Sequence, residues 1–267
     1  MHGRGGNLAA QEACLTVTEL TGKVAIVTGA GQGVGRGIAL ALAAQGATVA
    51  AVGRTLEKCE RTVAEIVAVG GSGIALSCDV GKREQVDQVV EEVVARLGSV
   101  AILVNNAHTS RPQTPIADVT DKDMAIALKG MFGALYFTQA CLPHLPDGQG
   151  RVIYLGSVSG LRGDAGFAAY AMAKEAIRGL ARVAARELGA RGITVNTVCP
   201  LSDSPGMDYM RETDPAFVPA LAAGTALGRI GDSENDVGRT VAYLCGEGGA
   251  YITGQTINVD GGTWMVP

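Results

Sequence analysis

The chain contains few aromatic and few charged residues. Aromatic side chains make up 4% of its 267 residues, and charged side chains make up 18%. Because 47% of the residues are hydrophobic, a disordered chain is excluded, and the core must be built from Ala, Val, Leu and Ile. The length is ample for one large α/β domain with a sizeable core.

The sequence also lacks the features of nucleic-acid-binding, metal-binding and membrane-spanning proteins. The formal net charge is −4, and there is neither a basic stripe nor a ladder of aromatics, so no nucleic-acid partner is expected. The 6 cysteines and 3 histidines show no metal-ligand spacing, which favours small buried thiols, a reducing cytoplasm and no metal. No apolar run approaches the ~18 residues of a membrane span, so no membrane partner is expected.

Residues 1–20 are expected to form a flexible leader before a single catalytic domain over residues 21–267. They contain one Arg, scattered polar residues and no apolar block of the kind found in signal peptides. The rest of the chain shows no internal repeat and no low-complexity linker, so nothing indicates a second domain.

From Lys23 onward, short apolar runs alternate with helical patterns. The runs predict strands at residues 24–28, 48–52, 73–78, 100–104, 151–155, 194–198 and 255–259. Helical spacing is found over residues 34–45, 57–69, 83–97, 123–145 and 166–188. Continuous apolar strands are buried on both faces, and helical crossovers make them parallel. The pattern predicts an α/β fold, a single-domain Rossmann-type doubly wound sheet of about seven strands with helices on both faces.

A glycine-rich turn follows the first predicted strand. Gly29, Gly33 and Gly35, with Gln32 and Val34 between them, depart from the common Gly-x-Gly-x-x-Gly spacing. Glycines here permit positive φ and let backbone N–H groups and a helix N-terminus approach a pyrophosphate. Glycines alone would also suit a tight turn without a ligand, but the position at the first strand-to-helix junction favours a bound dinucleotide.

Two residues after later strands bear on the choice of cofactor. Arg54 follows the second strand, where an acid would bind the ribose 2′-OH of NAD and a cation would accommodate the 2′-phosphate of NADP. NADP(H) is therefore slightly preferred over NAD(H), although Arg54 would also suit the exposed start of a helix. Asp79, after the third strand, is placed to accept a hydrogen bond from an adenine amino group or to cap the next helix.

These motifs resemble those of the short-chain dehydrogenase/reductase family over residues 21–265. The matching segments are, in order, the glycine turn, Asp79-Val80, Asn105-Asn106-Ala107, Ser157, Tyr170-x-x-x-Lys174 and the terminal run 251–262. The resemblance implies hydride transfer between NADP(H) or NAD(H) and a small-molecule secondary alcohol or ketone, and a homotetrameric assembly. It also implies cofactor contacts from Val80, Asn106, Ala107 and Pro200.

Ser157, Tyr170 and Lys174 are the candidate catalytic residues. Tyr170 and Lys174 are four residues apart, so they share one face of a helix. A phenol with a pKa near ~10 is a poor base at neutral pH, and a nearby ammonium lowers that pKa. We expect Tyr170 to exchange a proton with the substrate oxygen while Ser157 holds that oxygen. The resemblance adds that Tyr170 and Lys174 also contact the cofactor, Lys174 through the nicotinamide ribose.

Three positions depart from the family pattern. Gly130 stands where the family has an Asn that supports a relay water, largely through its backbone carbonyl, which Gly retains. His108 replaces the Gly after Asn105-Asn106-Ala107, and it is expected to contact the substrate or narrow the pocket, or else to be a solvated loop residue. Leu201 replaces the Gly after Pro200, so the loop that contacts the nicotinamide is expected to take a different path.

An apolar segment over residues 202–227 is expected to form a lid over the substrate, with Met207 as a contact, or to pack as a small helix pair. Its large apolar side chains are Met207, Tyr209, Met210, Phe217 and Leu221.

The competing interpretation is a nucleotide-binding protein without turnover, such as a sensor or an assembly subunit. Gly130 and Leu201 leave this alternative open. The intact Ser157, Tyr170 and Lys174 favour an enzyme, because a binder without turnover has no need for all three.

Overall fold

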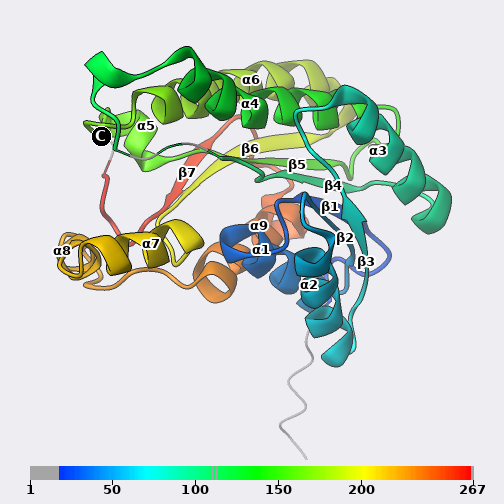
Figure 1. The fold of residues 1–267 in the computed structure, drawn as a ribbon. Coiled ribbons are helices and arrows are strands. Elements are labelled where there is room, and N and C mark those ends of the chain that lie inside the picture. Colours follow the sequence, from blue (N-terminus) through cyan, green and yellow to red (C-terminus); the bar gives the residue numbers. More distant parts are fainter. Residues whose placement is uncertain (1–17, 110, 112, 266–267) are drawn as a thin grey trace, which may run out of the picture.

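Seven parallel strands form the centre of the described part of the molecule (Figure 1). The computed structural model describes residues 18–109, 111 and 113–265. In them the strand order is β3-β2-β1-β4-β5-β6-β7, which confirms the predicted doubly wound sheet. The strands are Val24–Thr28 (β1), Thr48–Gly53 (β2), Ser72–Ser77 (β3), Ile102–Asn105 (β4), Arg151–Leu155 (β5), Thr194–Pro200 (β6) and Thr256–Val259 (β7).

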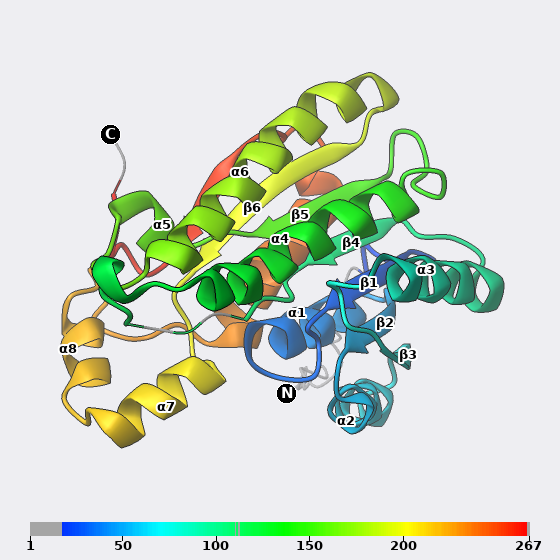
Figure 2. The same ribbon diagram turned by 45° about the horizontal axis from the view of Figure 1, so that its top comes forward.

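Helices cover both faces of the sheet (Figures 1 and 2). One face carries α1 (Gly33–Ala44), α2 (Leu56–Ala68) and α9 (Arg239–Cys245), and the other carries α3 (Arg83–Leu97), α4 (Asp121–Cys141) and α6 (Ala168–Leu188). The two core layers are mostly aliphatic, as the composition requires, and Phe137 and Tyr154 are their largest fully buried side chains. Among the described residues, no helix combines the length and apolarity that crossing a membrane needs.

Short helices gather at one end of the sheet. They are α5 (Val158–Arg162), after β5, and the pair α7 (Pro205–Thr213) and α8 (Phe217–Ala223), after β6. Figure 2 shows α7 and α8 projecting beyond the sheet near α1. The apolar segment over residues 202–227 thus contains two short helices.

The structure adds elements that hydrophobic periodicity did not reveal. A π-helical turn, η3 (Ser233–Gly238), leads into α9, and both pack against α1. Each has fewer than eight residues, so neither repeats an apolar pattern often enough to be recognised. Three further short turns are η1 (Ile116–Asp118), η2 (Gly189–Arg191) and η4 (Glu247–Gly249).

The boundary of the predicted leader needs correction at its end. Residues 1–17 lie outside the described part of the chain. Leu20, however, is fully buried in the core, and its N–H donates to the carbonyl of Gln45 at 2.9 Å. Because an apolar side chain in the core stabilises the domain, the packed unit includes Leu20 and begins before residue 21.

Close packing of α1 on η3 depends on Gly37. A Cβ on Gly37 would lie 2.3 Å from the carbonyl carbon and oxygen of Ser233. Gly179, inside α6, has no atom within 4 Å of the equivalent position. We expect Gly37→Ala to destabilise the protein by ~1–3 kcal/mol through overpacking, and Gly179→Ala to stabilise it by up to ~1 kcal/mol. Urea unfolding of both variants is the measurement, and equal shifts in the two would contradict this account of the packing.

Candidate active site

The carboxyl ends of the central strands surround a cavity. β1 pairs with β2 on one side and with β4 on the other. The connections that leave β1 and β4 therefore cover opposite faces of the sheet, through α1 and α4. A cavity of about 520 Å³ opens at this edge. Open α/β sheets bind ligands at such a switch point. The cavity is lined by ten of the predicted cofactor residues, namely Gly29, Gln32, Gly33, Val34, Gly35, Arg54, Asp79, Val80, Asn106 and Ala107.

The glycine turn requires glycine at the positions that the sequence analysis singled out. Gly29 and Gly33 have φ values of 69° and 53°, in the left-handed region that other residues rarely adopt. A Cβ on Gly35 would lie 2.3 Å from the Gly29 carbonyl oxygen. Helix α1 begins at Gly33, and the Gln32 side chain makes no capping bond, so the first N–H groups of α1 face the turn without a side-chain cap.

Thr28 and Asn106 fasten this turn to the end of β4. The backbone N–H groups of Asn106 and Ala107 each donate to Thr28 Oγ1 at 3.0 Å. The Asn106 amide Nδ2 donates to the carbonyl oxygens of Thr28 and Gly29, at 2.8 and 3.3 Å. The Asn106 side chain is therefore engaged in holding the turn, while its residue lines the cavity.

Two cationic side chains, those of Arg54 and Lys58, line the cavity just after the end of β2. Arg54 Nη2 donates to Thr109 Oγ1 at 3.3 Å, and Lys58 donates to the Gln32 side chain. Asp79 Oδ1 accepts the N–H of Gly81 at 3.1 Å, so part of its carboxylate closes a turn. The N-cap of α3 is Lys82, so the alternative in which Asp79 caps that helix is wrong.

The cavity is also lined by residues that the sequence analysis did not assign to the site, among them Lys58, Ser204 and Pro205. Lys58 lies in the first turn of α2, and Ser204 and Pro205 begin α7. Ser204 and Pro205 have the sequence signature of a helix N-cap followed by Pro, which could have located this helix start.

Ser157, Tyr170 and Lys174 come together beyond the end of β5. Ser157 is buried and caps α5 by accepting the N–H of Ser159 at 3.2 Å. Tyr170 and Lys174 lie one turn apart on α6, and Lys174 Nζ is 5.7 Å from the centre of the Tyr170 ring. Lys174 Nζ also donates to the Leu155 carbonyl at 2.8 Å, which anchors the ammonium to the last residue of β5.

Burial controls the ionisation of these groups in the ligand-free protein. It lowers the pKa of Lys174 from 10.5 to about 8. Burial also raises the pKa of the Tyr170 phenol, and the Ser157 hydroxyl acts in the opposite direction. The expectation that Lys174 lowers the pKa of Tyr170 below its ordinary value is therefore wrong for this ligand-free state, because desolvation of the phenolate outweighs the neighbouring groups.

His108 connects the cavity with Tyr170. Its ring packs edge-on against the Tyr170 ring, with 5.0 Å between centres and 77° between planes, and it also lines the cavity. The solvated-loop alternative for His108 is thus wrong, because both ring nitrogens are buried. A Cβ on Gly130 would lie 2.7 Å from His108 Nδ1, and α4 runs through Gly130 as an unbroken helix.

Five predicted site residues lie outside the cavity lining. Three of them are Ser157, Tyr170 and Lys174, and Tyr170 contacts the cavity through the ring of His108. The other two are Pro200 and Met207. Pro200 ends β6 and is paired with Val259 of β7, and Met207 is half-buried in the first turns of α7. The Leu201 N–H donates to the Val259 carbonyl at 2.9 Å, and its own carbonyl accepts from Gly231 at 3.2 Å. These bonds hold the loop after Pro200 against the segments of Val259 and Gly231.

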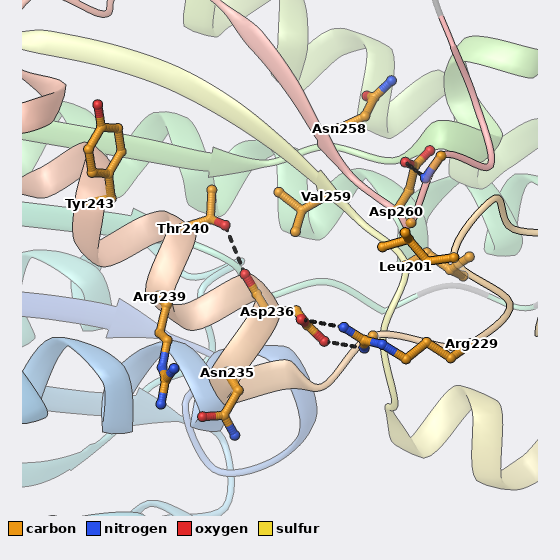
Figure 3. Close-up of a pocket in the computed structure, with 14 residues that line it drawn as sticks. Leu201, Arg229, Asn235, Asp236, Arg239, Thr240, Tyr243, Asn258, Val259 and Asp260 are labelled. Atoms are coloured by element: carbon orange, nitrogen blue, oxygen red, sulfur yellow. Dashed lines mark hydrogen bonds and ion pairs between the residues drawn. The ribbon is translucent and has the colours of Figure 1, made fainter.

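A second cavity, of about 500 Å³, lies between η3, α9 and β7 (Figure 3). Its principal charged groups, Arg229 and Asp236, form a two-bond ion pair at 2.6 and 2.8 Å. Asp260 accepts the N–H groups of Gly262 and Trp264. Arg229, Asp236 and Asp260 are thus already engaged within the protein, and the predicted cofactor residues line the other cavity, so the cavity at the glycine turn is the candidate active site. Within the described ranges, no cluster of three or more His, Cys, Asp or Glu could hold a metal ion.

The lowered pKa of Lys174 predicts a specific dependence of stability on pH. The folded protein releases the Lys174 proton near pH 8, whereas the unfolded chain keeps it to about pH 10.5. The unfolded state then binds more protons, so this residue makes the free energy of unfolding rise with pH across that window. We expect the difference between wild type and Lys174→Met, measured by urea unfolding from pH 7 to 10.5, to grow in favour of the wild type. A difference that is independent of pH would contradict the buried ammonium.

Comparisons with known proteins agree with this geometry. The family model described as enoyl-(acyl carrier protein) reductase matches residues 29–263. The chain is 35% identical to the 12alpha-hydroxysteroid dehydrogenase of a Clostridium species, over 92% of this chain and 98% of that protein. It is 36% identical to the 3-oxoacyl-[acyl-carrier-protein] reductase of Pseudomonas aeruginosa, over 92% of this chain and 99% of that one.

Solved structures share both the fold and the sequence. A short-chain dehydrogenase from Burkholderia cenocepacia in complex with NADP superposes with a TM-score of 0.84 and 36% identity, covering 92% of this chain and 99% of that chain. A blue fluorescent protein from a metagenomic library in complex with NADPH has the same TM-score and identity, covering 92% and 100%. Nothing in these comparisons favours the alternative of a binder without turnover. The chain therefore belongs to the short-chain dehydrogenase/reductase family of NAD(P)-dependent oxidoreductases.

Proposed function

We propose that this protein catalyses hydride transfer between NADP(H) and a secondary alcohol or ketone, with Tyr170 as the acid and base. The observation that carries the proposal is the placement of Ser157, Tyr170 and Lys174 at the same sheet edge as the glycine-turn cavity. Hydroxysteroid dehydrogenase and oxoacyl reductase relatives, which act on hydroxyl and keto groups by name, support this reaction class.

The residues of the cavity suit a dinucleotide. The glycine turn brings backbone close together where a Cβ would collide, and the uncapped N-terminus of α1 presents N–H groups to an anion. Gly29, Gly33 and Gly35 would admit the pyrophosphate, and Asp79 and Val80 would lie near the adenine. Lys174 donates one hydrogen bond within the described residues, and an ammonium has three donors, so ribose hydroxyls can accept the others.

Each catalytic residue then has a distinct task. The nicotinamide supplies or removes the hydride. In ketone reduction, the Tyr170 hydroxyl gives its proton to the substrate oxygen, and in alcohol oxidation it takes that proton back. The Lys174 ammonium stabilises the phenolate electrostatically, and Ser157 holds the substrate oxygen as negative charge develops on it.

The choice of NADP(H) over NAD(H) depends on the charges at the end of β2. Arg54 and Lys58 both line this side of the cavity, and no carboxylate follows Gly53 at the strand tip. A 2′-phosphate would therefore meet two cations, while a 2′-OH would lack the acceptor that NAD-binding sites provide. The NADP and NADPH complexes of the two similar structures agree with this choice.

The substrate side of the site is bounded by His108 and the α7–α8 pair. Pro205 Cδ lies 3.0 Å from where a Cβ of Gly33 would be, so α7 starts against the glycine turn. Tyr209 is exposed, whereas Met207, Met210 and Phe217 are half-buried. Apolar residues at this entrance would contact a hydrophobic or medium-sized small-molecule substrate, with Met207 reaching it on closure of the pair.

The same proposal includes a homotetramer in the cytoplasm. Phe132 on α4 and Met172 and Val183 on α6 are exposed apolar side chains on neighbouring helices, and β7 is the last strand on its side of the sheet. Such helix faces and sheet edges bury well against further copies of a chain. The described cysteines, Cys59, Cys78, Cys141, Cys199 and Cys245, are free and buried, which suits a reducing compartment.

Removal of the Tyr170 hydroxyl tests the chemical role directly. We expect Tyr170→Phe to lower turnover by ~10²-fold or more, because proton transfer to the substrate oxygen is lost, while NADPH affinity changes little. Fluorescence quenching measures affinity, and NADPH oxidation with a panel of ketones measures turnover. Unchanged turnover would remove Tyr170 from this role, and tight NADPH binding with no turnover of any ketone by the wild type would favour a binder without chemistry.

Charge reversal at Arg54 tests the cofactor choice. We expect Arg54→Asp to shift the preference from NADPH toward NADH by ~10-fold or more in kcat/KM, because a carboxylate repels the 2′-phosphate and accepts from the 2′-OH. Arg61→Asp is the matched control, since it makes the same charge change on α2 outside the cavity lining. An equal effect of both variants, or none from Arg54→Asp, would contradict the assignment.

A further inference from the structure

His108 presents polar atoms that nothing in the described protein satisfies. Both ring nitrogens, Nδ1 and Nε2, are buried and have no hydrogen-bond partner among the described residues. The imidazole nevertheless lies at the cavity, in edge-on contact with the ring of Tyr170. Because buried polar groups are nearly always paired in native proteins, unpaired nitrogens at this place indicate a partner that arrives with the ligand.

Gly130 provides the seat of the imidazole. A Cβ at residue 130 would approach His108 Nδ1 to 2.7 Å and the Ala107 carbonyl oxygen to 3.0 Å, so any larger residue would displace the ring. The ring is thus held between α4 on one side and Tyr170 on the other. The two departures from the family pattern are therefore linked, because the missing side chain at Gly130 leaves the space that the His108 ring fills.

The charge state of His108 restricts what it can bind. The titratable groups near it are Tyr170 and Lys174 from α6, and Lys129 from α4 lines the same cavity. Burial, and secondarily the Lys174 ammonium, lower the pKa of His108 to about 2. The imidazole is therefore neutral at physiological pH, with one nitrogen as donor and the other as acceptor.

We propose that His108 is a specificity-determining residue that binds a second, uncharged oxygen of the substrate, a hydroxyl or keto group close to the reacting carbon. This inference rests on the proposed function, because contact with Tyr170 is what places His108 beside the reacting carbon. A neutral donor and acceptor matches a hydroxyl, whereas a carboxylate or phosphate would need a cationic partner. A site built to bind a substrate hydroxyl also rejects the analogue that lacks it, since its own polar atoms then stay unpaired.

A matched pair of ketones tests this specificity. The probes are 3-hydroxy-2-butanone and 2-butanone, compared by kcat/KM in the wild type, His108→Phe and His108→Gln. Phe keeps an aromatic ring against Tyr170 but removes both nitrogens, and Gln keeps a donor and an acceptor. We expect His108→Phe to lower kcat/KM for the hydroxyketone by ~10–100-fold and for 2-butanone by less than ~3-fold, with partial recovery in His108→Gln. Equal losses for both ketones, or no loss for either, would overturn the proposal.

Nitrogen NMR of histidine provides a readout that does not require turnover. The chain has only 3 histidines, so the ¹⁵N signals of the His108 ring are assigned by comparison with His108→Phe. We expect these signals to stay in the neutral form from pH 5.5 to 8. In Tyr170→Phe with NADP⁺, where oxidation of the hydroxyketone is suppressed, they are expected to shift when 3-hydroxy-2-butanone is added but not when 2-butanone is added.

The two readouts separate this inference from the proposed function. A ring shift with the hydroxyketone, without reduction of any ketone, would retain the His108 site and reject the proposed reaction. Reduction of ketones with no ring shift and no selective effect of His108→Phe would retain the reaction and overturn the role of His108. A His108 ring that becomes protonated between pH 5.5 and 8 would also overturn it.

Discussion

A buried ammonium group is the constraint on which the rest of the site depends. Lys174 is 5% exposed, and its Nζ is fixed to the Leu155 carbonyl at the end of β5. Placing a charge in the interior is costly unless hydrogen bonds and nearby polar groups compensate it. This buried charge lies at the sheet edge where Tyr170 approaches the cavity. Its desolvation lowers the pKa of Lys174. The remaining N–H donors of the Lys174 ammonium are the ones that we propose bind the ribose hydroxyls of the cofactor.

The parallel sheet brings together groups that are far apart in the chain. The glycine turn follows β1, His108 follows β4, Ser157 follows β5, and Tyr170 projects from the start of α6. Their common location at one edge follows from strands that all run in the same direction. The Asn106 amide donates to the carbonyls of Thr28 and Gly29, so the segment after β4 is bonded directly to the glycine turn after β1. The same hydrogen bonds therefore position both the proposed dinucleotide turn and the segment that carries His108.

Much of this arrangement could be predicted from the sequence, and the failures have physical causes. The apolar runs located the strands of the sheet, most clearly the five central ones, because parallel strands buried on both faces are continuous in hydrophobicity. The glycine turn and the Tyr170–Lys174 spacing predicted residues that the structure brings to one edge of the sheet, because each depends on local backbone geometry. The π-helical turn η3, helix α9 and the role of Lys58 arise from tertiary contacts that no local pattern contains.

Ionisation was the least predictable property, because it depends on desolvation as well as on neighbours. Proximity alone suggested a lowered pKa for Tyr170, whereas burial raises it in the ligand-free protein. The proposed mechanism therefore requires that bound NADP⁺, whose nicotinamide ring is positively charged, would lower the pKa of Tyr170 together with Lys174.

The pH dependence of kcat for alcohol oxidation with NADP⁺ tests this requirement most directly. Oxidation needs the phenolate, so kcat rises with pH through the pKa of Tyr170 in the ternary complex. We expect an apparent pKa well below the ordinary ~10 of a phenol, and we expect this titration to be absent in Tyr170→Phe. An apparent pKa at or above ~10 would contradict it.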